Sequence, residues 1–155
     1  MSSQVLRTQG LTETAFLRFL RAHAAVTREL SARLEAAHGL TLSDFDVLVQ
    51  LFHAEGNRLR RVDLARTVLL TASGITRLLD GLERAGWVEK QRCASDARVT
   101  YACLTAAGLE KFESARSSHH ADIEELFGAR FSDEEKATLD ELLARLPLAD
   151  TACQK

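Results

Sequence analysis

Hydrophobic residues recur along most of this chain at steps of three and four, the spacing typical of helices with one buried face. The first such series runs through residues 11–37 in a heptad-like order. Its positions are Phe16, Leu20, His23, Thr27, Leu30, Leu34 and Ala37. We predict one long helix here that ends at Gly39, preceded by a loose tail over residues 1–10.

A second helix is predicted next. Its apolar face would consist of Val47, Leu48, Leu51 and Phe52. Ser43 and Asp46 have the spacing of a capping box at its start, and Gly56–Asn57 would end it. Residues 58–60 are then expected to form a short strand, and residues 62–68 a short helix.

The helix predicted over residues 71–85 has clearly separated faces. Its apolar face consists of Ile75, Leu78, Leu79 and Leu82. The opposite, polar face carries Ser73, Arg77, Asp80 and Arg84. Thr71 can cap the first turn with its hydroxyl, and Gly86 stands where a left-handed residue would end the helix. This is the pattern of a helix that rests on a small core and presents its other side to a polar surface.

A β-hairpin is predicted directly after this helix, because residues 87–91 and 99–104 are rich in β-forming side chains. A polar loop with Arg92 and Arg98 joins the two strands. Helix, turn, helix and hairpin is the order of a winged helix-turn-helix, in which the second helix enters the major groove of DNA. The hairpin, or wing, supplies contacts to the flanking backbone or to the minor groove.

Two further helices are predicted after the hairpin. The first begins at Thr105 and is broken at Gly128; the second begins at a capping box of Ser132 and Glu135 and ends at Pro147. Their seams comprise Leu109, Phe112, Arg116, His119, Ile123 and Leu126 in the first helix, and Leu139, Leu142, Leu143 and Leu146 in the second.

The seams of these long helices need more cover than a winged-helix core can offer. Left exposed, they would form a hydrophobic patch larger than soluble monomers tolerate. We therefore predict a symmetric homodimer, with two recognition helices about one DNA turn apart that read a roughly palindromic double-stranded site. The expected fold class is mainly α with a small β-hairpin (α+β). Residues 42–104 would form a winged helix-turn-helix lobe, and residues 11–38 and 105–147 a helical dimerisation region.

Composition agrees with a globular protein, since 46% of the 155 residues are hydrophobic and 27% are charged. No apolar run is long enough to span a bilayer, and the first residues lack a signal-peptide core, so we expect a cytoplasmic protein without a membrane partner. The three cysteines, Cys93, Cys103 and Cys153, have no metal-type spacing and agree with a reducing compartment.

The net charge of −2 is unevenly distributed. Residues 58–104 hold nine Arg or Lys against five Asp or Glu, so this segment is positive and the remainder of the chain is negative. Positive charge where the recognition helix and wing are predicted is what binding to phosphates requires.

Five short motifs follow one another through the same part of the chain. They are Leu64–Arg66, Ser73–Asp80, Leu82–Val88, Asp96–Arg98 and Leu104–Gly108. In order and spacing they resemble the MarR (multiple antibiotic resistance regulator) family of bacterial transcription regulators, and the flanking helices extend the resemblance over most of the chain. The chain departs from the family pattern at Leu69, where glycine is frequent, and at Val62, where a small polar cap is frequent.

The resemblance implies a homodimeric DNA-binding regulator, more often a repressor than an activator, which an effector releases from its promoter. The residues it places at the DNA are Thr71, Ser73, Gly74, Thr76 and Arg77 on the recognition helix, and Arg92, Asp96 and Arg98 in the wing. Arg77 would reach guanine or phosphate, Arg98 would enter the minor groove and Arg92 would contact phosphate. Asp96 would orient an arginine, because phosphate repels a carboxylate.

Polar residues interrupt two of the helical seams. They are His23, Thr27, Arg116 and His119. One interpretation is an effector pocket, where the family often binds aromatic carboxylates or phenols; the other is ordinary hydrogen bonding within the dimer interface. His119 and His120 point about 100° apart on a helix and cannot both face one ion, so no metal site is predicted.

Other features leave alternatives open. Cys93 lies beside Arg92 and near Arg98, and positive neighbours can activate a thiol, so a redox switch in the wing is conceivable. A winged helix can also serve as a protein-interaction or dimerisation module that does not bind DNA. The sequence holds no Gly-rich phosphate loop, no nucleophile elbow and no helical HExxH, so neither an enzyme activity nor a cofactor is predicted.

Overall fold

The computed structural model describes residues 3–68, 72–93, 96 and 98–146, and its elements follow the predicted order. They are α1 (Ser3–His38), α2 (Leu42–His53), β1 (Arg58–Arg60), α3 (Arg61–Thr67), α4 (Ala72–Arg84), β2 (Val88–Arg92), β3 (Thr100–Leu104), α5 (Ala106–Leu126) and α6 (Asp133–Leu143). Short 3₁₀ turns follow α2 at Glu55–Asn57 and α5 at Gly128–Arg130. The predicted class, mainly helical with a small antiparallel sheet, is confirmed.

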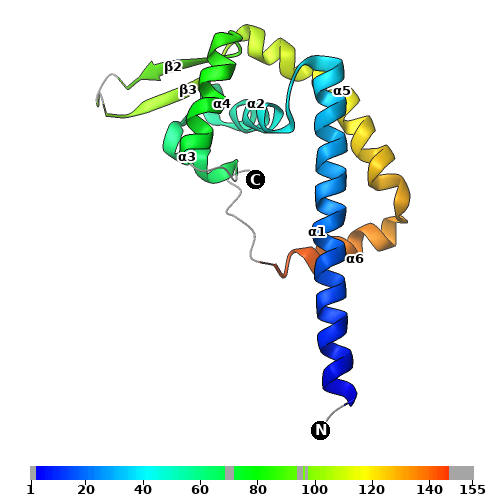
Figure 1. Ribbon diagram of the computed structural model, residues 1–155. Helices are drawn as coiled ribbons and strands as arrows, with labels where there is room; N and C mark the ends of the chain where they lie inside the picture. The colour runs from blue at the N-terminus through cyan, green and yellow to red at the C-terminus, as the bar shows by residue number, and fades with distance from the viewer. Residues whose placement is uncertain (1–2, 69–71, 94–95, 97, 147–155) are drawn as a thin grey trace.

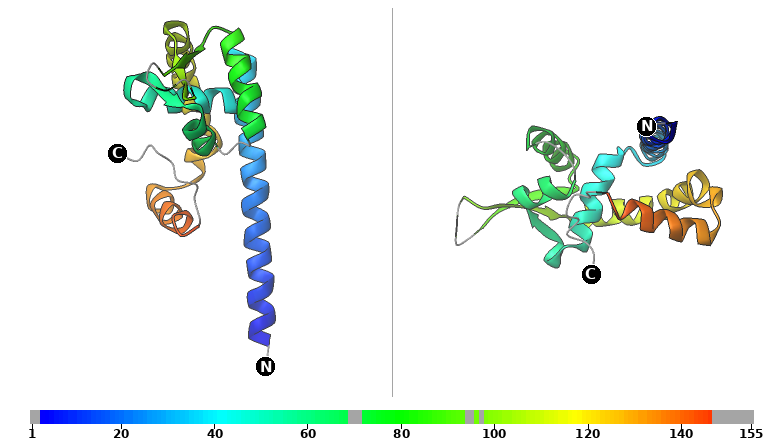
Figure 2. Two further views of the ribbon diagram at one scale, coloured as in Figure 1. Left: turned by 90° about the vertical axis from the view of Figure 1, so that its left-hand side faces the viewer. Right: turned by 90° about the horizontal axis from the view of Figure 1, so that it is seen from below.

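The three strands form one antiparallel sheet in the order β1-β3-β2. Arg58 pairs with Cys103, and Val88 pairs with Leu104, so the predicted short strand does join the hairpin. The β2–β3 hairpin extends beyond α3 and α4 on the side away from α1, as Figures 1 and 2 show. This placement gives the lobe a projecting wing beside the α3–α4 pair.

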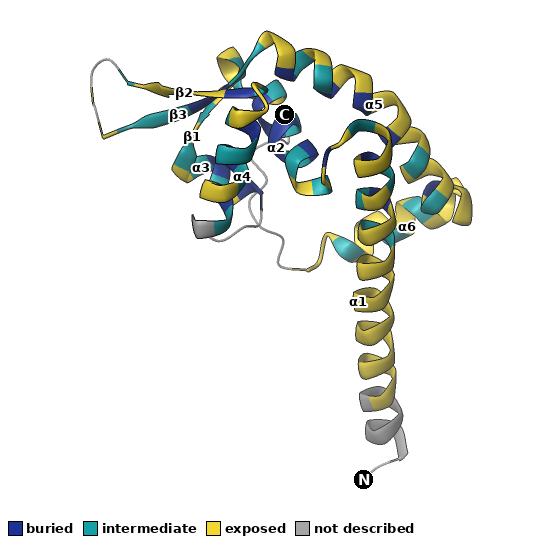
Figure 3. Ribbon diagram, turned by 45° about the horizontal axis from the view of Figure 1, so that its top comes forward, coloured by how far each residue is buried: buried dark blue, intermediate teal, exposed yellow. Residues whose placement is uncertain are grey.

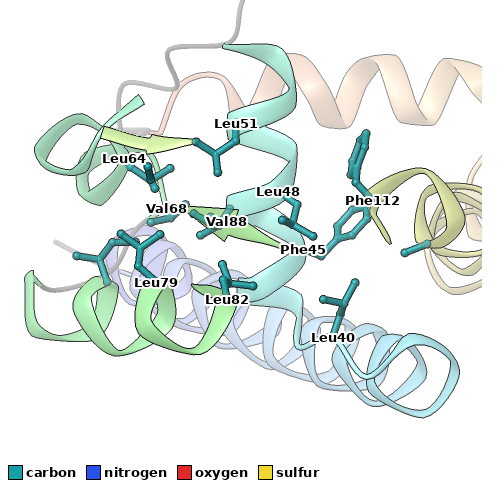
Figure 4. Packing of buried hydrophobic residues seen from close by; sticks show 14 of the residues in the cluster. Leu40, Phe45, Leu48, Leu51, Leu64, Val68, Leu79, Leu82, Val88 and Phe112 are labelled. Carbon is teal, nitrogen blue, oxygen red and sulfur yellow. The ribbon is translucent and has the colours of Figure 1, made fainter. Parts of the chain in front are cut away.

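The hydrophobic core lies between α2, α3, α4 and the sheet, and α5 closes it on one side (Figure 4). Its largest fully buried side chains are Phe112, Leu34, Leu40, Leu48, Leu51, Leu64, Leu79, Leu82 and Val47. Ile75, Leu79 and Leu82 of α4 are buried as predicted, while Leu78 is half-buried. The apolar face of α4 therefore holds the helix against the core and leaves its polar face outward.

The end of α4 is tied to the start of α5 by a compact junction, here called the α4–α5 junction. Gly86 has a φ of +76°, and the N–H of Trp87 donates to the carbonyl of Leu82 at 3.0 Å, which completes a Schellman motif. Thr105 caps α5 and also donates its hydroxyl to the carbonyl of Gly86 at 2.6 Å. A Cβ at Gly108 would collide with the carbonyl oxygen of Trp87, so the backbone after α4 lies too close to the first turn of α5 for any side chain there.

The predicted loose tail is wrong, because α1 begins at Ser3. Residues 3–10 contain no proline, and a single glycine, Gly10, costs about 1 kcal/mol relative to alanine without ending a helix. Gly39, with a φ of +65°, ends α1 as predicted. The N-terminal part of α1 stands away from the rest of the molecule (Figure 2).

The start of α2 also differs from the prediction. Thr41 and Asp44 form the capping box, with the N–H of Asp44 donating to Thr41 Oγ1 at 3.1 Å, whereas Ser43 and Asp46 were expected. Leu40 and Phe45 flank this cap and are both buried in the core, the arrangement of a hydrophobic staple. Burial of this pair places the start of the helix two residues earlier. The helix ends at His53, three residues before the predicted stop.

The seams of α1, α5 and α6 are covered only in part by their own chain. Leu30 and Leu34 of α1 are buried, and Arg33 binds Asp122 and Glu125 of α5 at 2.9 and 3.0 Å. Figure 3 shows the exposed remainder of α1 and α6. The exposed large hydrophobic residues of these helices and the turn between them are Leu11, Phe16, Leu17, Phe19, Leu20, Ile123, Phe127, Phe131, Leu142 and Leu146.

Candidate nucleic-acid interface

The polar face of α4 carries the side chains predicted to read DNA. Thr76 and Arg77 are exposed, and Gly74 is half-buried near the start of the helix. Ser73 lies in the first turn of α4, but its side chain, like all of Thr71, falls outside the described residues. The predicted residues that can be placed thus lie together at the N-terminal end of one exposed helical face.

Two acidic residues of α4 are bound by a lysine of the wing. Lys90 contacts Asp80 at 2.8 Å and Glu83 at 2.7 Å. Its ammonium group holds the pKa of Asp80 below the usual range, chiefly through the hydrogen bond. The carboxylates are thereby partly neutralised, and the same contacts tie α4 to β2. The exposed Arg77 and Arg84 consequently set the sign of charge on this face.

The wing presents Arg92 at the end of β2 and Arg98 before β3, both exposed. Asp96 accepts a hydrogen bond from the backbone N–H of Arg98 at 3.0 Å, an arrangement that fixes the backbone from which Arg98 projects. Cys93 is half-buried, and its N–H donates to the carbonyl of Val99 at 3.0 Å. Burial raises the pKa of Cys103, so that thiol resists ionisation.

Two arginines that sequence reasoning missed lie beside this surface. Arg61 Nη2 donates to Thr76 Oγ1 at 3.0 Å, which links α3 to the outer face of α4, and Arg60 pairs with Asp63 at 2.8 Å. Both line a hollow of about 430 Å³ between α3, α4 and the base of the wing, together with Arg98. We call it the α3–wing hollow. The signal in the sequence was the basic run at residues 58–61, which was assigned only to a strand.

A second hollow, of about 490 Å³, lies between α1, α2 and α5. We call it the α1–α5 hollow; it is lined by His23, Leu42, Ser43, Phe45, Asp46, Val49, Val68 and His119. His119 is 8% exposed, and among the described residues its Nδ1 is buried without a hydrogen-bond partner. Burial lowers the pKa of His119 and raises that of Asp46, to which Gln50 donates at 3.3 Å.

The structure brings together two of the four residues predicted to bind an effector, His23 and His119. Thr27 donates its hydroxyl to the carbonyl of His23 at 2.7 Å, within its own helix. Arg116 is exposed, with its guanidinium 6.0 Å from the ring centroid of Phe112. Neither Thr27 nor Arg116 lines the α1–α5 hollow. Asp46, which does, was named in the sequence analysis only as part of a capping box.

Comparison with known proteins identifies the family to which this arrangement belongs. The model of the MarR family matches residues 38–99, which span the winged helix-turn-helix from the end of α1 to the wing. The HTH-type transcriptional regulator YdgJ of Bacillus subtilis (strain 168) is 31% identical over 121 residues, or 78% of this chain and 72% of that protein. The chain belongs to the MarR family.

Other MarR family proteins extend the likeness to function. Sco3205, a MarR family regulator from Streptomyces coelicolor solved in complex with DNA, has a TM-score of 0.81 and 25% identity, covering 85% of this chain and 86% of its own. The B. subtilis repressor YetL is 34% identical over 111 residues, which are 72% of this chain and 66% of that protein. The chain is thus a DNA-binding transcriptional regulator and not an enzyme, as predicted.

The described part of this MarR family chain contains neither a metal-binding cluster nor a helix that could span a membrane. No group of three or more His, Cys, Asp or Glu side chains there could hold a metal ion. No helix there has both the length and the apolar character needed to cross a bilayer. Residues 1–2, 69–71, 94–95, 97 and 147–155 lie outside both statements.

Proposed function

We propose that the chain is a homodimeric repressor of a roughly palindromic operator, released when a small phenol binds in the α1–α5 hollow. The observation that carries the effector proposal is the buried ring of His119, whose Nδ1 has no partner among the described residues. Buried polar atoms in proteins are nearly always hydrogen-bonded, so a histidine with an orphan nitrogen in the wall of a hollow supports a ligand that binds there.

A homodimer is supported by the exposed apolar residues of the helical arms. MarR family proteins work as dimers on operator DNA. In this chain Phe16 is 58% exposed and Leu20 is 43% exposed on one arm, and Leu142 is 47% exposed on another. Two copies related by a two-fold axis would bury these surfaces against each other. The arms, proposed as 11–38 with its extension to Ser3 and 105–147, then form the dimer, and 42–104 the DNA-binding lobe.

On DNA, the N-terminal end of α4 would enter the major groove and the wing the adjoining minor groove. The proposed contacts are those of the sequence analysis: Thr71, Ser73, Gly74, Thr76, Arg77, Arg92 and Arg98, with Asp96 as an orienting group. The exposure of both Arg77 and Arg98 supports this docking. A protein bound to a promoter in this way would block transcription by steric exclusion. The similar protein YetL is named a repressor, which supports this role.

The lining of the α1–α5 hollow favours a neutral hydroxylated ring over an aromatic carboxylate. Phe45 lies with its ring centroid 4.6 Å from that of His119, and Val49 and Val68 add apolar surface. A phenolic hydroxyl can hydrogen-bond to Nδ1 of His119, whereas the carboxyl of Asp46 would repel a second carboxylate when ionised. The hollow joins both arms to the lobe, so a ligand that binds better at one arm–lobe spacing shifts the dimer toward that spacing.

The test uses the purified full chain and a duplex selected from a random-sequence pool. Fluorescence anisotropy of this duplex should show binding that weakens as salt rises, and a neutral phenol should release it at concentrations where benzoate does not. His119→Gln should blunt the release without changing affinity for DNA in the absence of phenol. His120→Gln, an exposed neighbour on the same helix, is the matched control and should behave as wild type.

Three results would count against the proposal. If the protein did not bind duplex DNA, the proposal that it is a repressor would be wrong. If it sedimented as a monomer, the proposal of a two-fold symmetric operator would be wrong. Equal release of the duplex from wild type and His119→Gln would show that the phenol acts elsewhere. The last outcome leaves DNA binding intact, so the effector proposal and the DNA proposal fail separately.

A further inference from the structure

The α3–wing hollow lies between the two elements that are proposed to enter DNA grooves. A major groove and the minor groove beside it are separated by one sugar-phosphate strand, so a protein that fills both must let that strand pass between its reading elements. In this lobe the strand would pass over the α3–wing hollow. We infer that the hollow seats that strand, with Arg61 on a phosphate and Val62 against the deoxyribose, while Arg98 crosses the strand toward the minor groove. The inference rests on the proposed docking of α4 and the wing.

The guanidinium of Arg61 is preorganised to bind a phosphate. Its Nη2 donates to Thr76 Oγ1 at 3.0 Å, which fixes the guanidinium between α3 and α4. A guanidinium has five N–H donors in a planar fork, so one bond to Thr76 leaves donors for the oxygens of a phosphate. Among the described residues Arg61 forms no ion pair, whereas its neighbour Arg60 is bound to Asp63 at 2.8 Å. Prior ordering reduces the entropy lost when the phosphate binds.

The second cation comes from the other wall of the hollow. Arg98 belongs to the wing, and its backbone N–H is held by Asp96 at 3.0 Å. Arg61 therefore approaches the strand from the helical side and Arg98 from the wing side. The positive charge of Arg98 beside the strand adds to the attraction for its phosphates, while the guanidinium continues toward the minor groove.

The hollow is apolar between its cations. Val62 is 62% exposed in the first turn of α3, and Ile75, at 3% exposure, also lines the hollow. A DNA strand alternates a charged phosphate with a largely apolar deoxyribose. Val62 next to Arg61 repeats that alternation along the first turn of α3. Contact with the sugar would remove Val62 from water, which accounts for an apolar side chain at this place.

The experiment compares Arg61→Gln with wild type on the selected duplex, in the full-length protein. Each phosphate contact contributes about 0.9 to the slope of log Kd against log salt, so losing one contact in each half-site should lower the slope by about 1.8. Arg58→Gln is the matched control, because Arg58 lies over the ring of Tyr101 and outside the hollow. This control removes the same charge from the same lobe, and its slope should equal that of wild type.

Uncharged methylphosphonates placed at single positions of the duplex locate the contact. Wild type should lose affinity about tenfold at one position per half-site, on the strand between the major-groove and minor-groove contacts. Arg61→Gln should be indifferent to that position and remain sensitive at the others. Val62→Ala should weaken binding about twofold with an unchanged salt slope, because an apolar contact releases no counterions.

A positioning role through Thr76 would give different results. If Arg61 only held Thr76, then Thr76→Val would reproduce the effect of Arg61→Gln, and both variants would keep the wild-type slope and the wild-type methylphosphonate pattern. That outcome would overturn the inference, as would an unaltered slope for Arg61→Gln alone. If the wild-type protein bound no duplex, that result would instead contradict the proposed function, on which this inference depends.

Discussion

The DNA-binding lobe and the helical arms use apolar residues in opposite ways. In the lobe, Leu48, Leu51, Leu64 and Leu79 have no exposed surface, and four elements close around them (Figure 4). In the arms, large hydrophobic side chains from Leu11 to Leu146 remain in contact with solvent. The same chain thus contains one fully buried core and one apolar surface that it covers only in part.

This difference separates folding from assembly. A residue of the lobe contributes to stability inside one chain, so its effect is independent of protein concentration. A residue of the arms contributes once a second surface covers it, so its effect follows the concentration of the protein. The contrast predicts which substitutions destabilise the fold and which only weaken the proposed dimer.

The largest effect is expected in the lobe. Leu79→Ala removes a fully buried side chain from the apolar face of α4 and should lower the free energy of unfolding by about 2–5 kcal/mol. Urea unfolding followed by circular dichroism measures the change, which should be the same at low and high protein concentration. A concentration-dependent loss would mean that the core of the lobe also depends on the partner chain.

A smaller effect is expected at the exposed face of α1. Leu20→Ala should weaken the dimer by about 1–2 kcal/mol per protomer, from the apolar surface it no longer buries. Sedimentation equilibrium should show a raised dimer dissociation constant, while the lobe keeps its stability at high concentration. The exposed Arg28 of the same helix provides a control at Arg28→Gln, which removes no apolar surface. Unchanged dimerisation of the Leu20 variant would place the interface elsewhere.

The α4–α5 junction connects the two regions and should respond to the addition of a single methyl group. Gly108→Ala brings a Cβ against the carbonyl oxygen of Trp87, which cannot move without disturbing the Schellman turn, so a cost of about 1–3 kcal/mol is expected. Thermal unfolding measures it. Gly81→Ala is the control, because a Cβ there meets no atom within 4 Å. Equal stability of both variants would show that the junction is loosely packed.

The smallest effect is a pH dependence at the boundary between lobe and arm. Burial raises the pKa of Asp46, so the folded chain binds that proton more readily than the unfolded chain and gains stability as pH falls through the raised pKa. Asp46→Asn should therefore be more stable than wild type at pH 7, and the advantage should shrink toward acid pH. Urea unfolding across this range tests the sign; an advantage that grows on acidification would refute it.

His119 should act in the opposite direction across the same hollow. Burial lowers its pKa below the ordinary value of 6.5, so the stability it contributes is present above pH 6.5 and is lost as pH falls below it. His119→Gln should remove that part of the acid sensitivity, which separates it from the effect of Asp46 in the same measurements.

Periodicity predicted the long helices, because each of them buries one side, and β-forming residues predicted the hairpin between them. The stops at Gly39 and Gly86 and the capping box of Ser132 and Glu135 were also predictable, since local backbone geometry decides them. The choice of Thr41 as a cap was not. It depends on burial of Leu40 and Phe45 together, which a pattern of spacings does not rank.

The candidate sites could be predicted only in part, because they depend on contacts between elements. The bond from Arg61 to Thr76 depends on how α3 crosses α4, so the sequence could select Thr76 but not show that Arg61 reaches it. His23 and Thr27 share one seam of α1, yet only His23 lines the α1–α5 hollow, because the hydroxyl of Thr27 is already bonded within the helix. A sequence shows which residues share a side of a helix, but not how far each reaches across to the next.

The close approach at Gly108 gives this regulator a control point behind its reading surface. Hydrogen bonds of Trp87 and Thr105 join the last turn of α4 to the first turn of α5. A change in packing at that joint would re-aim α4 within the groove without altering any atom that meets a base. A search for variants with altered DNA binding should therefore include residues 104–108, which lie outside the proposed contact surface.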